Sequence, residues 1–237
     1  MKRYWESSKL ILFFCLFITS FSSFAQESSM LFTRNGQVYF DGNEGYNYEG
    51  SPYFSDDWLK GEVVFKNGEK LENADLILDL YGGKVIQKSE EENGMYLDTS
   101  NIDYVLLYKG ENEHKFKKIR PQLFLDGREK GAIFYEILPI EGEKLVLEYS
   151  IEFINGKDIN QGRALLNPDY SNRFVLKKKY FVLLKNGIYN EVKLTNKGVA
   201  KVFDDEKVAI KNYIGENNLN AQNYVDLDKV IKFYYSL

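Results

Sequence analysis

The chain has 237 residues, a net charge of −4, one cysteine and one histidine. This length accommodates one large domain or two small ones, and a chain of this size buries roughly 70% of its unfolded surface, so its core needs no disulfides. The mild acidity argues against nucleic acid or anionic lipid as a partner.

The first 25 residues have the pattern of a cleaved export signal. A positively charged start is followed by the apolar run 10–18 and then by small residues, and the cleavage site is predicted between Ala25 and Gln26. Nine apolar residues are too few to span a bilayer, which takes about 20. We therefore expect a mature protein that begins at Gln26 and is located in the periplasm, outside the cell or at its surface.

Removal of this signal changes the chemistry of the chain. Cys15, the one cysteine, lies inside the signal and not at the cleavage point, so we expect no lipid anchor. Without cysteine, the mature chain is expected to have no thiol nucleophile, thiol redox centre or cysteine-ligated zinc. Three basic residues and one acidic residue leave with the signal, which takes the net charge from −4 to −6. No second apolar run of membrane length follows, so we expect no integral membrane segment.

Asn-Gly pairs dominate the middle of the chain and indicate β-hairpins, since both residues tolerate the positive φ of a type I′ turn. They occur at Asn35, Asn67, Asn93, Asn155 and Asn186. The strongest hairpin signal has a strand at 180–184, a turn at Asn186-Gly187 and a return at 188–194. Other strands are predicted at 61–65, 76–80, 85–88, 95–97, 102–108, 116–119, 134–138 and 145–153.

The predicted strand 145–153 alternates cleanly between two faces. Leu145, Leu147 and Tyr149 fall on an apolar face, whereas Glu148 and Glu152 fall on the other. This period of two predicts a half-buried antiparallel strand with one face in solvent.

From about Thr195 the apolar spacing changes to that of helices. Val199, Val202 and Phe203 indicate a first helix, and Asp204 or Asp205 is predicted to cap a second. A third helix follows from the spacing i, i+3, i+4, i+7, with an outward ion pair four residues apart. Its apolar residues are Leu227, Val230, Ile231 and Tyr234, and its ion pair is Asp228–Lys232.

These patterns together predict an α+β protein. The mainly antiparallel β body at 26–194 is expected to have about 8 to 12 strands, arranged as a curved sheet, a sandwich or an open barrel. The segment 195–237 is expected to be a small unit of three short α-helices packed on that body.

The sequence contains no recognisable catalytic, cofactor or metal motif. His114 lies in a polar run without the partners of a triad or a zinc site, so we predict an exposed loop histidine. Glu148 and Glu152 lie about 13 Å apart on one strand, beyond the roughly 5 to 9.5 Å of glycosidase pairs. We therefore predict solvated carboxylates there, no cofactor and no enzymatic activity.

Two groups of residues form a candidate contact surface. The first contains Tyr53 and Trp58 in an aromatic-rich segment, and the second contains Arg173 and Lys177 near a three-lysine run. Aromatic side chains at these positions can fill a core or stack on a ligand. The lysines are typical of a strand edge guarded against aggregation, with a patch for an anionic ligand as the alternative.

Several segments match one known pattern: GSPY at 50–53, FYEIL at 134–138, the YFVLLKNG hairpin and the closing FYYSL. Together they resemble a family of uncharacterised exported proteins of Gram-negative bacteria, with a β-rich body and a helical tail. The resemblance covers about residues 50–237 and implies export and this architecture. Its tail positions are Phe203, Asp205, Lys207, Ile210, Tyr213, Ile214, Leu219, Asp226, Leu227, Lys229, Ile231, Phe233, Tyr234, Ser236 and Leu237.

The leading functional hypothesis is a non-catalytic envelope protein that acts through contact with another protein or a small ligand. The first alternative is a small-molecule or lipid carrier that uses the interior of a curved sheet, which needs an apolar cavity of about 300 Å³ or more. A glycan-directed hydrolase ranks last.

Overall fold

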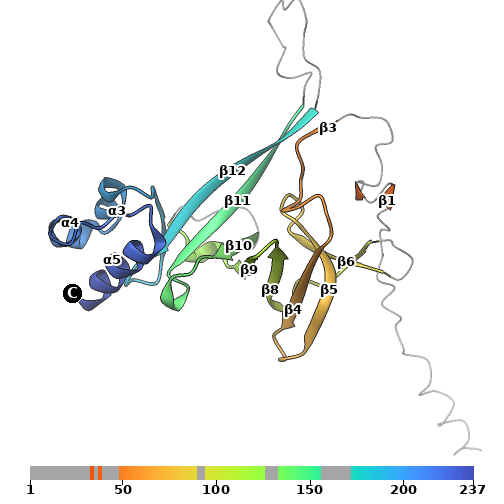
Figure 1. Ribbon diagram of the computed structural model, residues 1–237, viewed down its shortest axis with the longest axis horizontal. Coiled ribbons are helices and arrows are strands. Elements are labelled where there is room, and N and C mark those ends of the chain that lie inside the picture. The colour runs from red at the N-terminus through yellow and green to blue at the C-terminus, as the bar shows by residue number, and fades with distance from the viewer. Residues whose placement is uncertain (1–32, 35–36, 39–47, 90–93, 126–132, 156–171) are drawn as a thin grey trace, which may run out of the picture.

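The computed structural model is dominated by one large, open, curved sheet with three helices at one end (Figure 1). The structure describes residues 33–34, 37–38, 48–89, 94–125, 133–155 and 172–237. The predicted signal and its cleavage site at Ala25 and Gln26 lie outside these residues, as do parts of the Asn-Gly pairs at Asn35, Asn93 and Asn155. The α+β class and the antiparallel β body are confirmed.

The 11-stranded sheet has the order β13-β12-β11-β10-β9-β8-β4-β5-β6-β7 and is antiparallel along this path, while β3 pairs with β12 in parallel. Two further short strands, β1 (Thr33–Arg34) and β2 (Gln37–Val38), pair only with each other. The sheet strands are β3 (Tyr48–Glu49), β4 (Leu59–Phe65), β5 (Lys70–Asp79), β6 (Lys84–Lys88), β7 (Gly94–Tyr96), β8 (Ile102–Lys109), β9 (Asn112–Ile119), β10 (Ile133–Ile137), β11 (Leu145–Ile154), β12 (Asn172–Leu183) and β13 (Tyr189–Val192).

Two of the predicted Asn-Gly hairpins are confirmed, but their turn type differs from the expected one. At both turns only the glycine has positive φ, +88° at Gly68 and +79° at Gly187. The N–H of Gly187 donates to the Leu184 carbonyl at 2.9 Å, and the N–H of Gly68 donates in the same way to Phe65. These are therefore longer turns that end in a glycine bulge, and not two-residue type I′ turns.

Residues 50–54, here called the clasp, connect two distant parts of the sheet. The clasp follows β3 at β12 and crosses to β5, where the Pro52 carbonyl accepts a hydrogen bond from the N–H of Leu80 at 3.0 Å. The N–H of Phe54 donates to the Leu78 carbonyl at 2.9 Å. These bonds attach the clasp to β5, and the Phe54 ring packs against the main apolar core.

The three C-terminal helices are confirmed, with one correction at the second. The Thr195 side chain accepts from the N–H of Gly198 at the first helix, and Asn223 caps the third. Asp204 and Asp205 do not cap the second helix, because they belong to a short 3₁₀ turn that precedes it. The helices are α3 (Asn196–Val202), α4 (Lys207–Glu216) and α5 (Tyr224–Ser236), and the 3₁₀ turn is η3 (Asp204–Glu206).

The helices cover one face of the sheet, here called the inner face. The predicted apolar positions of α5 are buried there, and the predicted outward ion pair joins Asp228 to Lys232 at 2.8 Å. A second apolar cluster lies on the opposite, outer face, where the Phe124 ring stacks on Tyr135 and Tyr189. The start of β11 is therefore buried on both faces, which corrects the expectation of one solvated face along the whole strand.

Candidate functional site

The structure places the four predicted contact residues in two groups. Tyr53 and Trp58 pack together around Ile77 and Ile86 at the far end of the sheet from the helices. Burial, with the nearby Asp79 carboxylate as the second cause, raises the pKa of Tyr53 well above its usual value. Arg173 and Lys177 lie on β12, on the same side of the strand. The first pair is thus brought together by an apolar cluster, and the second pair by strand β12.

The part of the molecule around Arg173 and Lys177 is a projecting ribbon. β11 and β12 pair over ten residues each, whereas β10 pairs with β11 only at Val146–Glu148 and β13 pairs with β12 only at Tyr180–Leu183. Beyond these positions the two strands run on together (Figure 1). We call residues 149–154 of β11 and 172–179 of β12 the arm.

Among the described residues, most of the arm has no strand beside it. The one additional strand there is β3, which pairs only with Asn172 and Arg173. An unpaired strand edge presents N–H and C=O groups that can bind a further strand. The arm is therefore a candidate surface for protein contact, and it could not be located from the sequence because strand length alone does not reveal which neighbours end early.

The side chains of the arm combine positive charge with exposed apolar area. Lys177 forms an ion pair with Glu152 across the two strands, and the Lys178 ammonium lies 5.2 Å from the centre of the Tyr149 ring. Leu176 is 49% exposed and Phe153 is 38% exposed. Among the described residues no strand pairs with Lys177, Lys178 or Lys179 on the side of β12 away from β11, and the guarded-edge interpretation stays a prediction.

The sole histidine is not an exposed loop residue, which corrects the sequence prediction. His114 is in β9, its side chain is 21% exposed, and its Nδ1 lies 2.6 Å from Glu136 Oε1 on β10. The Tyr149 hydroxyl donates to the other carboxylate oxygen of Glu136 at 2.5 Å. Glu136 is the acid of the apolar FYEIL block, and a buried acid needs polar partners. That requirement is the sequence signal from which this cluster could have been predicted.

The His114–Glu136–Tyr149 cluster has the components of a proton relay, but an aromatic side chain packs against it. The edge of the Phe54 ring packs against His114 at 4.9 Å between ring centres, and Phe54 also contacts Tyr149. Burial, followed by the hydrogen bond to Glu136, raises the pKa of Tyr149 far above its usual value, so its hydroxyl stays protonated. The cluster therefore satisfies buried polar groups inside the sheet.

The two glutamates considered for hydrolysis have different environments. Glu152 is exposed and ion-paired with Lys177, as expected for a solvated carboxylate. Glu148 is only 6% exposed, which corrects the prediction for this residue. Its strand segment lies under the outer-face cluster around Phe124 and Tyr135, so the residue is covered although it alternates with apolar neighbours.

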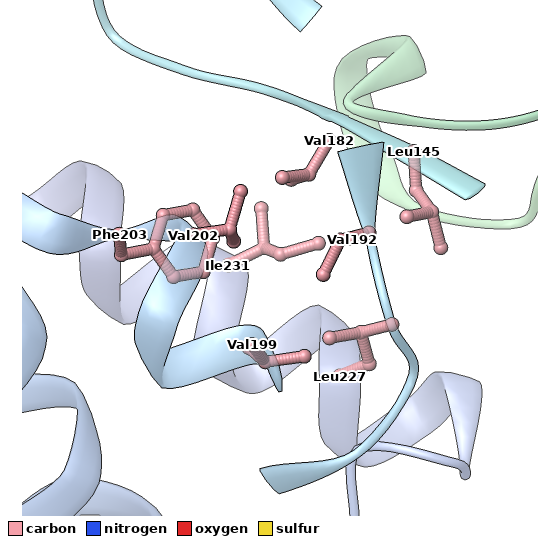
Figure 2. Close-up of a pocket in the computed structure, with 8 residues that line it drawn as sticks. All are labelled: Leu145, Val182, Val192, Val199, Val202, Phe203, Leu227 and Ile231. Carbon is pink, nitrogen blue, oxygen red and sulfur yellow. The ribbon is translucent and has the colours of Figure 1, made fainter. Parts of the chain in front are cut away.

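The space between the helices and the sheet is filled with apolar side chains (Figure 2). It does not admit a water molecule. A larger hollow of about 530 Å³ is open to solvent beside η3 and is lined mostly by charged residues. The side chains that converge in the first space are Leu145, Val182, Val192, Val199, Val202, Phe203, Leu227 and Ile231.

Neither a metal centre nor a membrane helix is found within the ranges that the structure describes. No group of three or more potential metal ligands occurs there, and no helix there is long and apolar enough to cross a bilayer. In comparisons with family models, curated proteins and solved structures, nothing matched this chain. The arm and the sheet interior are therefore the described features that bear on function.

Proposed function

We propose that this chain is an exported, non-catalytic protein of the cell envelope that acts by binding another protein through its arm. The observation that carries this proposal is the ribbon of β11 and β12, which extends past β10 and β13 with strand edges open along the described residues. Exposed apolar side chains on the same ribbon, led by Leu176, add area that a partner can bury.

The interior of the molecule favours this proposal over a carrier. The Phe54 ring contacts three other rings on the inner side of the curved sheet, and the space under the helices is closed by apolar side chains. A carrier needs an apolar cavity of about 300 Å³ or more. The hollow beside η3 reaches that size, but charged side chains dominate its lining.

The arrangement of the acids also favours binding over hydrolysis. Glu136 points to the inner face and shares its carboxylate with His114 and Tyr149, while Glu152 is held by Lys177. Hydrolysis of glycans needs two carboxylates about 5 to 9.5 Å apart on either side of a substrate. Glu148 and Glu152 are four residues apart on one strand, which separates them by about 13 Å.

Export is tested by the N-terminus of the protein isolated from its own host. We expect mass spectrometry of the protein from the envelope or the medium to give a chain that begins at Gln26, with no lipid attached. A cytoplasmic protein that retains residues 1–25 would contradict the export part of the proposal.

Contact through the arm is tested by photo-crosslinking in the host. A photoreactive amino acid replaces Leu176 on the arm in one strain, and the 74%-exposed Val208 on α4 in a control strain. We expect a discrete crosslinked protein from position 176 that position 208 does not give. Equal crosslinking at positions 176 and 208 would contradict the proposal, and so would the absence of crosslinking from both position 176 and position 153 of the arm.

A further inference from the structure

The β12 side of the arm contains a gap in the sheet between two strands that are already in place. β3 pairs with Asn172 and Arg173, and β13 begins to pair at Tyr180. Gly50, with φ of +75°, turns the chain away from β12 directly after β3 and lies against the Phe174 carbonyl. Residues 175–179, here called the open segment, thus have β11 on one side and no described strand on the other.

The length of the open segment suits one short strand. Five residues at a rise of about 3.3 Å per residue span roughly 17 Å, which is the length of an average strand in a globular protein. β3 and β13 both pair with the edge of β12 that faces away from β11. A strand in the gap would fill the space between them along that edge.

The side chains of the open segment specify what would lie beside them. Register with β11 places Val175, Lys177 and Lys179 on the outer face, and Leu176 and Lys178 on the inner face. Directly opposed cross-strand pairs are stabilised by opposite charges and by apolar contact. A fitting strand therefore has acidic residues opposite Lys177 and Lys179, with an apolar residue opposite Leu176.

A second copy of this chain is a poor occupant of the gap. If two β12 strands paired antiparallel about the centre of the open segment, Lys177 would face Lys177 of the other copy. Lys178 would face Leu176, and Lys179 would face Val175. Like charges directly opposite each other are destabilising, and neither apolar residue would gain an apolar partner.

We infer that the open segment binds an extended, acidic segment of a partner protein, which inserts as a strand between β3 and β13. This inference rests on the proposed function, since it assigns the partner and the pairing mode of the same arm. Main-chain hydrogen bonds to the β12 edge supply affinity, and the lysines and Leu176 supply the sequence preference. Glu152 and Glu148 face Lys177 and Lys179 from β11, but the three lysines together with Arg173 outnumber these carboxylates. The remaining positive charge attracts an acidic segment from a distance.

The test uses the full chain in its own host, with a photoreactive amino acid at one of three sites. Positions 176 and 178 report on the open segment, whereas position 153 reports on the arm from β11. Mass spectrometry then identifies the crosslinked peptide. We expect positions 176 and 178 to capture one segment that has acidic residues at alternate positions.

Charge reversal in the open segment tests the preference for an acidic partner, and the same charge reversal elsewhere on the chain is the matched control. Lys177→Glu with Lys179→Glu is expected to lower the crosslink yield from position 176 about tenfold, because two attractive cross-strand pairs become repulsive. A tenfold change corresponds to about 1.4 kcal/mol. Lys197→Glu with Lys211→Glu changes the net charge equally at exposed sites on α3 and α4 and should leave the yield unchanged. Circular dichroism of both variants confirms that they fold.

The outcomes separate this inference from the proposed function. Capture of a protein from position 153 but not from 176 or 178 would overturn the inserted strand and leave contact through the arm intact. The inference also fails if the captured peptide lacks acidic residues or if the captured species is a lipid or a polysaccharide. Absence of capture at all three positions would overturn both proposals.

Discussion

The two ends of the β11–β12 ribbon show how the same pair of strands can be both core and surface. At the base, β10 and β13 pair on either side, the helices cover the inner face, and Phe124 and its neighbours cover the outer face. On the arm these neighbours are missing among the described residues, and Leu176 and Lys177 are exposed. Burial here is decided by which strands lie alongside, and much less by the alternation within the strand.

The largest expected contrast is between a side chain at the helix-covered base and one on the arm. Phe203 is fully buried and stacks on Tyr234 with ring centres 4.1 Å apart. We expect Phe203→Ala to lower the free energy of unfolding by about 3–5 kcal/mol. Leu176→Ala should change it by no more than about 0.5 kcal/mol. Urea unfolding measures both, and similar losses would remove the distinction between base and arm.

A smaller loss is expected from the polar cluster inside the sheet. Glu136→Ala leaves His114 and the Tyr149 hydroxyl without their shared acceptor. A buried donor without an acceptor costs about 1–3 kcal/mol, and two donors are affected, so we expect a loss of about 3 kcal/mol. The exposed Glu72→Ala is the control and should be near neutral in the same urea titration. If both variants were neutral, the cluster would contribute no stability.

Gly50 in the clasp and Gly68 in the turn between β4 and β5 form a matched pair of glycines. Both Gly50 and Gly68 have positive φ, but a Cβ on Gly50 would lie 2.3 Å from the Phe174 carbonyl oxygen, whereas a Cβ on Gly68 meets no atom within 4 Å. We expect Gly50→Ala to cost about 2 kcal/mol and Gly68→Ala about 1 kcal/mol. Thermal unfolding of the two variants compares them, and a larger loss at Gly68 would argue against close contact between clasp and arm.

The smallest effect is expected from the ion pair across the arm. Lys177 and Glu152 are both more than half exposed, and exposed ion pairs contribute about 0–1 kcal/mol. Lys177→Ala should therefore change the free energy of unfolding by less than about 0.5 kcal/mol. A double-mutant cycle with Glu152→Ala isolates the pair. A coupling energy well above 1 kcal/mol would show that the arm is more enclosed than its exposure indicates.

Much of the fold could be predicted from local patterns. The hairpin around Asn186-Gly187 and helix α5 follow from turn chemistry and from apolar spacing, and neither depends on distant residues. The expected cap at Asp204 or Asp205 failed because the chain forms a 3₁₀ turn there, which holds both aspartates before α4 begins.

The candidate site was less accessible to prediction because it depends on long-range neighbours. His114 lies in a run that is polar in sequence, yet its strand places it beside Glu136, 22 residues away. Glu148 is buried and lies opposite Tyr135 of β10, a neighbour that its own alternation does not reveal. The lysines at 177–179 are typical of a strand edge, but their sequence does not show that β13 stops pairing with β12 at Tyr180, which sets the length of that edge along the described residues.

Amide hydrogen exchange of the free protein tests most directly whether β12 is closed at its base and open along the arm. We predict slow exchange at Tyr180–Leu183, where β11 and β13 pair on both sides. The amides of residues 175–179 that face away from β11 should exchange fast, since they have no described partner strand. Equally slow exchange along the whole of β12 would contradict the account, because the edge would then be covered before any partner binds.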